Sequence, residues 1–140
     1  MTLVVDTSVV LKWVVAEQDS DRAVRLIGLP LVAPDILRAE LANALWKKVR
    51  IRRELSEEQA RRGLSRASAP LRLVPSAPLA DRALALGLAL SHPVYDCFFL
   101  ALAEELDTCL ITADRRFLQR LYDTPLAVRA VSVEEWRPDA

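Results

Sequence analysis

Short apolar runs alternate with longer helix-like segments along the whole chain, and this alternation restricts its fold more than any other feature. Five runs are typical of buried strands, because they are nearly continuous in apolar residues. They lie at residues 3–6, 31–33, 71–74, 109–112 and 128–131. Strands that are separated by helices are joined by crossovers. The sequence therefore predicts an α/β sandwich with a mostly parallel central sheet flanked by helices.

Helix signals occupy the intervals between these runs. We expect Asp35 to cap a long helix that reaches Arg53, after Pro34 has stopped the second strand. Ser56 and Gln59 match a capping box at the start of the following helix. The expected helices cover residues 8–16, 19–27, 35–53, 56–67, 79–90, 93–106 and 115–122.

The length of 140 residues and the apolar share of 52% predict one folded domain, residues 1–140. No apolar run approaches the roughly 18 residues that cross a bilayer. The opening MTLVVDTSVV has no basic leader before its apolar stretch, so it is not typical of a signal peptide. Cys97 and Cys109 match no zinc motif and are expected to be buried thiols. We therefore expect a cytoplasmic protein that does not bind membranes.

Two aspartates lie directly beyond predicted strands. Asp6 closes the run LVVD, and Asp114 follows the run CLIT with one residue between. Ligands of open α/β sheets bind outside the carboxyl ends of the strands, which makes both residues candidates for a site. Each aspartate is equally well placed to cap the helix that follows it. The sequence leaves both interpretations open.

Two further acids stand where a solvated surface residue is not expected. Asp96 lies in line with the apolar positions Phe99, Leu100 and Ala103 of its helix, although it is also placed as a cap. Glu40 lies in the middle of the long third helix, and none of its neighbours three or four residues away is basic. A surface glutamate usually has such a basic partner. Glu40 is therefore expected to be bound to a cation.

Four acids that converge without a basic partner repel one another and raise each other's pKa values unless a cation neutralises them. Ligand sets made of oxygen atoms select hard ions, here Mg²⁺ or Mn²⁺. Such an ion activates water and stabilises the charge that develops on a phosphodiester. The acids Asp6, Glu40, Asp96 and Asp114 thus predict a metal-dependent site for phosphodiester hydrolysis.

The composition excludes several other mechanisms. The single histidine, His92, rules out a nuclease that uses two histidines as acid and base, and no GxSxG motif is present. His92 precedes Pro93 and is expected at a helix end rather than in catalysis. Three glycines are too few for a phosphate-binding loop, and the few Cys and His residues disfavour zinc.

Basic residues gather in one segment although the formal net charge is zero. Nine basic and only three acidic residues lie between positions 47 and 72. One interpretation is a solvated helix surface. The other is an RNA-binding surface in which Lys47, Arg50 and their neighbours contact phosphates. Trp46, beside Lys47, is the aromatic residue expected to pack against a partner chain.

Four stretches taken together resemble the PIN domain, and more narrowly the bacterial toxins of the VapC group, which pair with VapB antitoxins. They are VVDTSVVLKW, the helix around Glu40, HPVYDCFFLALAEE around Asp96 and LITADRRF around Asp114. The resemblance extends over residues 3–135. Each stretch alone occurs by chance, whereas four acids in this order and context are specific.

The resemblance implies a PIN-like three-layer sandwich and Mg²⁺- or Mn²⁺-dependent endonucleolytic cleavage of RNA by a metal-activated water. It also implies a homodimer and inhibition by a VapB-like antitoxin. Carried over by position, the metal-binding catalytic acids are Asp6, Glu40, Asp96 and Asp114. Ser8 and Thr112 match polar positions that support the same pocket.

Two other classes of function fit the sequence less well than an endoribonuclease. A catalytically inactive PIN-like module that binds RNA or protein would gain nothing from four carboxylates that repel phosphate. A receiver domain would need adjacent acids on its first strand and a late lysine, and a phosphatase of the DxDx type would need an acid at position 8, where this chain has Ser8. The sequence therefore favours the endoribonuclease.

Overall fold

The computed structural model describes residues 1–138, so the last two residues of the expected domain, 139–140, lie outside the described part. Its centre is a five-stranded sheet in the order β3-β2-β1-β4-β5, in which every neighbouring pair is parallel. This confirms the predicted α/β class and its flanked sheet. The strands are β1 (Leu3–Val5), β2 (Leu31–Pro34), β3 (Leu71–Val74), β4 (Leu110–Thr112) and β5 (Ala130–Ser132).

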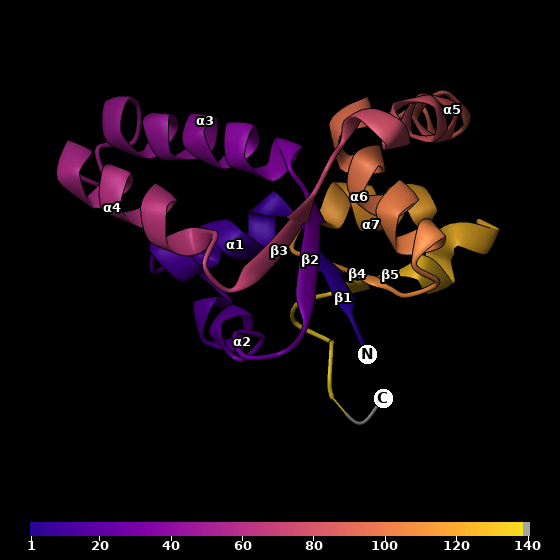
Figure 1. The fold of residues 1–140 in the computed structure, drawn as a ribbon, viewed down its shortest axis with the longest axis horizontal. Coiled ribbons are helices and arrows are strands. Elements are labelled where there is room, and N and C mark those ends of the chain that lie inside the picture. Colours follow the sequence, from indigo (N-terminus) through magenta and orange to yellow (C-terminus); the bar gives the residue numbers. More distant parts are fainter. Residues whose placement is uncertain (139–140) are drawn as a thin grey trace.

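Helices cover both faces of this sheet. Helices α1 to α4 lie on one side and α5 to α7 on the other (Figure 1). This division follows from the strand order, because right-handed crossovers that run in opposite directions from the central strand place their helices on opposite faces. The helices are α1 (Thr7–Val14), α2 (Ser20–Val24), α3 (Ile36–Arg50), α4 (Glu57–Ala67), α5 (Ala80–Leu90), α6 (Val94–Glu105) and α7 (Arg115–Leu121), with the 3-10 turns η1 (Ala77–Leu79) and η2 (Pro125–Arg129).

The core lies against both faces of β1, all of whose residues are buried. Helix α6 packs across β1, β2 and β4, and its segment from Phe99 to Ala103 is buried throughout. On the other face, Val9 and Val10 of α1 are fully buried. Burial on two faces explains why β1, β2 and β4 are continuous apolar runs. Within residues 1–138 no single helix is long and apolar enough to cross a bilayer; one bent pair, Ala77–Leu90 with Val94–Glu105, reaches that length and composition together.

The third helix begins differently from the prediction. Asp35 occupies the cap position, yet its side chain makes no capping bond. Instead Ser76, located after β3, accepts a hydrogen bond from the Ile36 backbone N–H at 2.9 Å. The Asp35 carboxylate accepts two hydrogen bonds from Ser76, one from the backbone N–H and one from the hydroxyl. The start of α3 is therefore tied to a segment about 40 residues away in the chain.

Two strand boundaries also correct the prediction. Pro34 belongs to β2, paired with Val74 of β3. The proline is tolerated because β1 pairs with β2 only at Leu31 and Val32, so no partner on the β1 side requires an N–H from Pro34. The last strand begins at Ala130 rather than at position 128, because Pro125 starts the 3-10 turn that extends to Arg129.

Helix α4 begins as predicted. Both halves of the capping box are present, with Ser56 accepting from the Gln59 N–H and Gln59 accepting from the Ser56 N–H. In the same helix Gly63 lies against α1, so close that an added Cβ would meet Val14 Cγ1 at 2.3 Å. The absence of a side chain at Gly63 therefore sets how closely α4 approaches α1.

Candidate metal centre

The candidate site lies beyond the carboxyl ends of β1 and β4, which are neighbours in the sheet. The chain leaves β1 toward β2 on one side, whereas β4 and β5 extend the sheet on the other. At such a switch point the connections diverge to opposite faces and leave a crevice. Asp6 immediately follows β1, while Thr112 ends β4 and Asp114 lies two residues beyond it.

Asp6 is buried, and its carboxylate is held by three donors. Hydrogen bonds arrive from the hydroxyls of Ser8 and Thr112 and from the Val9 N–H. Each hydroxyl is itself fixed, because Ser8 Oγ accepts from the Ala113 N–H and Thr112 Oγ1 accepts from the Asp114 N–H, both at 3.0 Å. The two predicted supporting residues thus orient Asp6 and connect it to the segment after β4.

Burial raises the pKa of Asp6 from 3.8 to about 7, although its donors act in the opposite direction. The charge of Asp96 raises this pKa further. A carboxylate in this position is unfavourable when ionised unless a cation lies nearby. Asp6 also accepts from the Val9 N–H as the N-cap of α1, so capping and membership of the site are compatible.

Asp96 and Asp114 converge with His92. One possible ligand atom from each of these three residues lies within 4.8 Å of the other two. Asp114 caps α7 by accepting from the Phe117 N–H at 3.1 Å, while Asp96 lies in the first turn of α6 and makes no capping bond. Burial raises the pKa of Asp96, and the charge of Asp114 raises it further.

His92 is a member of the site that the sequence analysis placed only at a helix end. Its Nε2 lies 2.6 Å from Asp96 Oδ2, a hydrogen bond that lowers the pKa of Asp96. The imidazole packs against the ring of Phe117, with 4.8 Å between ring centroids. The available signal was the spacing of four residues between His92 and Asp96. The position of His92 before Pro93 instead indicated a helix end.

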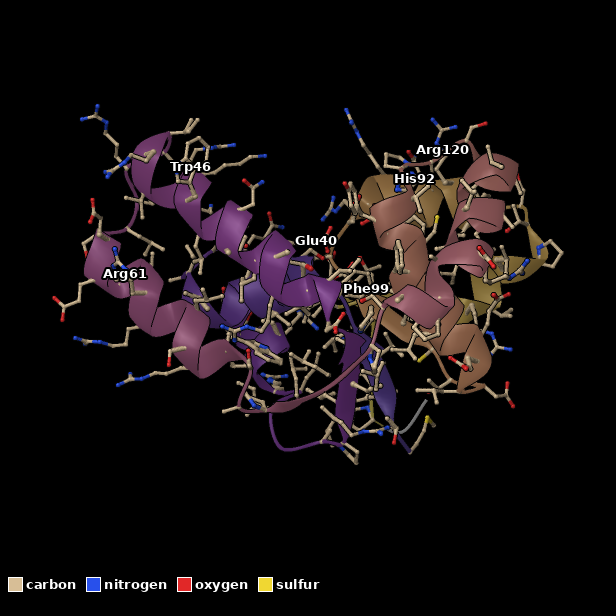
Figure 2. All side chains as sticks on the ribbon, turned by 45° about the horizontal axis from the view of Figure 1, so that its top comes forward. Glu40, Trp46, Arg61, His92, Phe99 and Arg120 are labelled. Carbon is tan, nitrogen blue, oxygen red and sulfur yellow. The ribbon has the colours of Figure 1, made fainter. Side chains whose placement is uncertain are left out.

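Glu40 approaches the site from the other side of the sheet, on α3 (Figure 2). Its Oε1 accepts a hydrogen bond from the Thr7 hydroxyl at 2.7 Å. Burial raises the pKa of Glu40, and the charge of Asp96 raises it further. Thr7, which directly follows Asp6, is a second residue that the sequence analysis missed. Its only signal was its place beside the first acid.

The four expected acids are therefore assembled unequally. Asp96 and Asp114 share the tight group with His92, whereas Asp6 and Glu40 are held beside it by hydroxyl groups and interact electrostatically with Asp96. No ion pair of residues 1–138 joins a lysine or arginine to any of these four acids. Several oxygen donors, raised pKa values and no basic partner fit a hard divalent cation.

A groove with a volume of about 1250 Å³ opens at this cluster. Asp96, Asp114 and His92 form part of its wall, and arginine side chains of α7 form another part. The basic segment at residues 47–72 lies elsewhere, on α3 and α4, where Trp46 and Arg61 lie far from His92 in Figure 2. Arg50 of that segment is paired with Glu57 at 2.6 Å.

Comparison with known proteins gives consistent results. A family model described as PIN domain matches residues 3–122. Ribonuclease VapC3 of Pyrobaculum aerophilum is 34% identical over 125 residues, which cover 86% of this chain and 95% of that protein.

Two solved structures share the fold. PAE2754 from Pyrobaculum aerophilum superposes with a TM-score of 0.69 at 24% identity, covering 96% of this chain and 93% of that one. VapBC2 from Rickettsia felis, bound to a DNA fragment from its promoter, gives a TM-score of 0.66 at 15% identity, with 94% and 98% covered.

Proposed function

The chain belongs to the PIN-domain family, and on this basis we propose that it is a metal-dependent endoribonuclease, the toxin of a toxin–antitoxin pair. The observation that carries the proposal is the convergence of Asp96, Asp114 and His92, with Asp6 and Glu40 beside them, at the switch point of the sheet. The similarity to Ribonuclease VapC3 over most of both chains supports RNA as the substrate.

Mg²⁺ or Mn²⁺ is the ion that these residues fit. Asp96, Asp114, Asp6 and Glu40 would hold it, directly or through water. When bound, the ion supplies Lewis acidity, which activates a water for attack on a phosphodiester and stabilises the leaving oxygen. The pKa values of Asp6, Glu40 and Asp96 are raised mainly by burial and to a smaller extent by repulsion between the acids, and a bound cation would oppose both effects.

The surrounding residues fix the acids in place. Ser8 and Thr112 hold both oxygens of Asp6, and Thr7 holds one oxygen of Glu40. His92 orients Asp96 through its Nε2. Hydrogen bonds from outside the set of ligands orient metal-binding side chains and contribute to metal affinity. These four residues are therefore positioning residues for the proposed centre.

We propose Lys47 as a phosphate-binding residue because it lies two helical turns beyond Glu40 on α3 and forms no ion pair within residues 1–138. Arg50, the second RNA-binding residue proposed from the sequence, is weakened in that role by its pairing with Glu57. Lys47 would bind a phosphate at a distance from the acids, because the segment at residues 47–72 does not line the groove that contains Asp96 and Asp114.

We also propose protein partners and a cellular location for this chain. A VapB-like antitoxin is inferred because the similar structure from Rickettsia felis is a VapBC pair. The exposed ring of Trp46, 54% accessible on α3, suits a protein partner, either that antitoxin or a second copy in a homodimer. Residues 1–140 would act as one domain in the cytoplasm, where the free thiols Cys97 and Cys109 stay reduced.

The test is cleavage of a mixed RNA pool by the purified, antitoxin-free protein with Mg²⁺, with Mn²⁺ and with EDTA. Asp96→Asn is compared with Glu105→Gln, which removes one exposed acid from the far end of the same helix. We expect cutting with either metal, none in EDTA, loss of activity in Asp96→Asn and full activity in Glu105→Gln.

Two outcomes would count against the proposal. Cutting by Asp96→Asn at the wild-type rate would remove that acid from the site. RNA binding without cleavage under any metal would favour the alternative, a catalytically inactive PIN-like module that binds RNA or protein. Binding would be scored on the same pool by a gel-shift measurement.

A further inference from the structure

The groove that begins at the acid cluster continues along α7, and neither the acids nor the basic segment at residues 47–72 accounts for this part. Its wall includes Arg116 and Arg120 together with His92 and Asp96. In Figure 2 Arg120 lies close to His92, on the side of the molecule opposite Arg61. The groove thus places arginine side chains beside the proposed metal centre.

Arg116 and Arg120 are exposed and lie one helical turn apart on the same side of α7. Four residues of helix advance about 6 Å, a spacing comparable to that of successive phosphates along a nucleic-acid strand. Neither residue takes part in an ion pair within residues 1–138. Arg115 differs, because it is paired with Glu134 at 3.4 Å.

Arg116 disfavours the helix that carries it, whereas Arg120 lies in the last turn, where the helix dipole favours a basic side chain. Arg116 stands in the first turn of α7, where the helix dipole favours acidic side chains. Two like charges four residues apart also repel each other. Residues that oppose local stability are frequently retained for function. The geometry of α7 therefore points to a ligand with negative charge.

The segment at residues 47–72 is less available to RNA than its composition indicated. Lys48 is bound to Glu17 and Glu54, Arg50 to Glu57, and Arg62 to Glu58. These contacts neutralise three of its basic residues within the protein. The segment also does not line the groove that contains Asp96 and Asp114.

We propose that Arg116 and Arg120 bind consecutive phosphates of the RNA strand next to the bond that is cut. The strand would leave the acid cluster past His92 and run along this face of α7. Glu134 and Glu135 also line the groove, and Glu134 is paired with Arg115, so Arg116 and Arg120 are the groove arginines that form no ion pair within residues 1–138. This inference rests on the proposed function and adds the surface that holds the substrate.

The test measures the salt dependence of RNA binding. A fluorescent single-stranded oligoribonucleotide is titrated with protein carrying Asp96→Asn, in Mg²⁺, between about 50 and 300 mM KCl. Into this background we introduce Arg116→Ala with Arg120→Ala, or, as a control with the same change in charge, Arg61→Ala with Arg66→Ala on α4. The binding constant K falls as salt rises, and each lost phosphate contact makes the slope of log K against log salt less steep by about 0.7 for a single strand.

We expect the two alanine substitutions on α7 to make the slope less steep by about 1.4. The two alanine substitutions on α4 should leave the slope nearly unchanged. Arg116→Lys with Arg120→Lys should keep the slope, because the charges remain. Circular dichroism verifies that all variants are folded. In the otherwise wild-type enzyme, the α7 alanine pair should raise KM for the same RNA more than it lowers kcat.

An unchanged slope in the α7 pair, or an equal decrease in the α4 pair, would overturn the inference. The proposed function is judged separately, by metal-dependent cleavage with the unaltered protein. If that protein cuts RNA and the α7 pair binds normally, only the assignment of the groove is wrong. If the unaltered protein neither binds nor cuts RNA, the proposed function itself fails.

Discussion

Replacing Asp6 by Asn should stabilise the metal-free protein at alkaline pH, although the residue is buried at the centre of the site. Burial raises the Asp6 pKa from 3.8 to about 7. One pKa unit corresponds to about 1.36 kcal/mol, so ionised Asp6 opposes folding by about 4 kcal/mol above pH 7. Asn carries no charge and avoids this penalty. It offers one acceptor oxygen to the hydroxyls of Ser8 and Thr112 instead of two, which costs about 1 kcal/mol.

The direction of the pH effect follows from the raised pKa. Between pH 4 and 7 the folded protein holds a proton on Asp6 that the unfolded chain has released, so its free energy of unfolding falls as the pH rises. Asp6→Asn lacks this dependence. Near pH 4 the free energy of unfolding of Asp6→Asn should be slightly lower than that of the wild type. At pH 8 it should be higher than that of the wild type by about 3 kcal/mol.

Urea denaturation in EDTA at pH 5 and pH 8 measures this difference. Asp81→Asn, which alters an exposed aspartate on α5, controls for loss of a carboxylate as such. Adding Mg²⁺ should then stabilise the wild type more than Asp6→Asn, because the stabilisation by a ligand of the folded state increases with the logarithm of its affinity. A variant less stable than the wild type at pH 8 in EDTA would refute the reasoning. So would a difference that is the same at both pH values.

Two further substitutions test the surroundings of the site, and a third tests the packing of α4 against α1. His92→Ala removes the ring that contacts Asp96 and should weaken Mn²⁺ binding about 10- to 100-fold by titration calorimetry; an unchanged Kd would deny His92 a positioning role. Thr7→Val removes the hydroxyl that donates to Glu40, so the pKa of Glu40 should rise further and Mn²⁺ binding should weaken. The free energy of unfolding, measured by urea denaturation, should fall by about 1 kcal/mol. An Mn²⁺ affinity equal to that of the wild type would contradict this. Gly63→Ala should lower the free energy of unfolding by about 1–3 kcal/mol because its Cβ collides with a stiff valine, whereas wild-type stability would show that α4 shifts freely.

The features predicted correctly from the sequence are those with a local signal. Buried parallel strands are read as short apolar runs, and the capping box at Ser56 and Gln59 is contained within four residues. Asp6 and Asp114 each follow such a run, and the sheet places the ends of β1 and β4 side by side, while their role as metal ligands stays a prediction. Membership of the PIN-domain family agrees with the resemblance noted from the four acidic stretches.

The features that were missed depend on contacts between distant residues. Ser76 replaces Asp35 as the cap of α3 from another part of the chain. Lys48 is neutralised by Glu17, 31 residues earlier, which no count of charges within a segment reveals. His92 lay within reach of a local rule, but the spacing of four residues was applied only inside helices. The pair with Asp96 shows that this spacing also holds across the proline that begins a helix.

The pairing of β1 with β4 also governs when the centre can form as the chain is made. Thr112 donates to Asp6 across 106 positions in the sequence, and Asp114 comes later still. Contacts this distant must await the arrival of the second partner, and chains emerge from the ribosome with the N-terminus first. A nascent chain that ends before β4 holds Asp6, Glu40 and Asp96 but not the strand that completes their arrangement. A protein that cuts RNA therefore acquires its full centre only after β4 has been translated, 106 positions beyond Asp6.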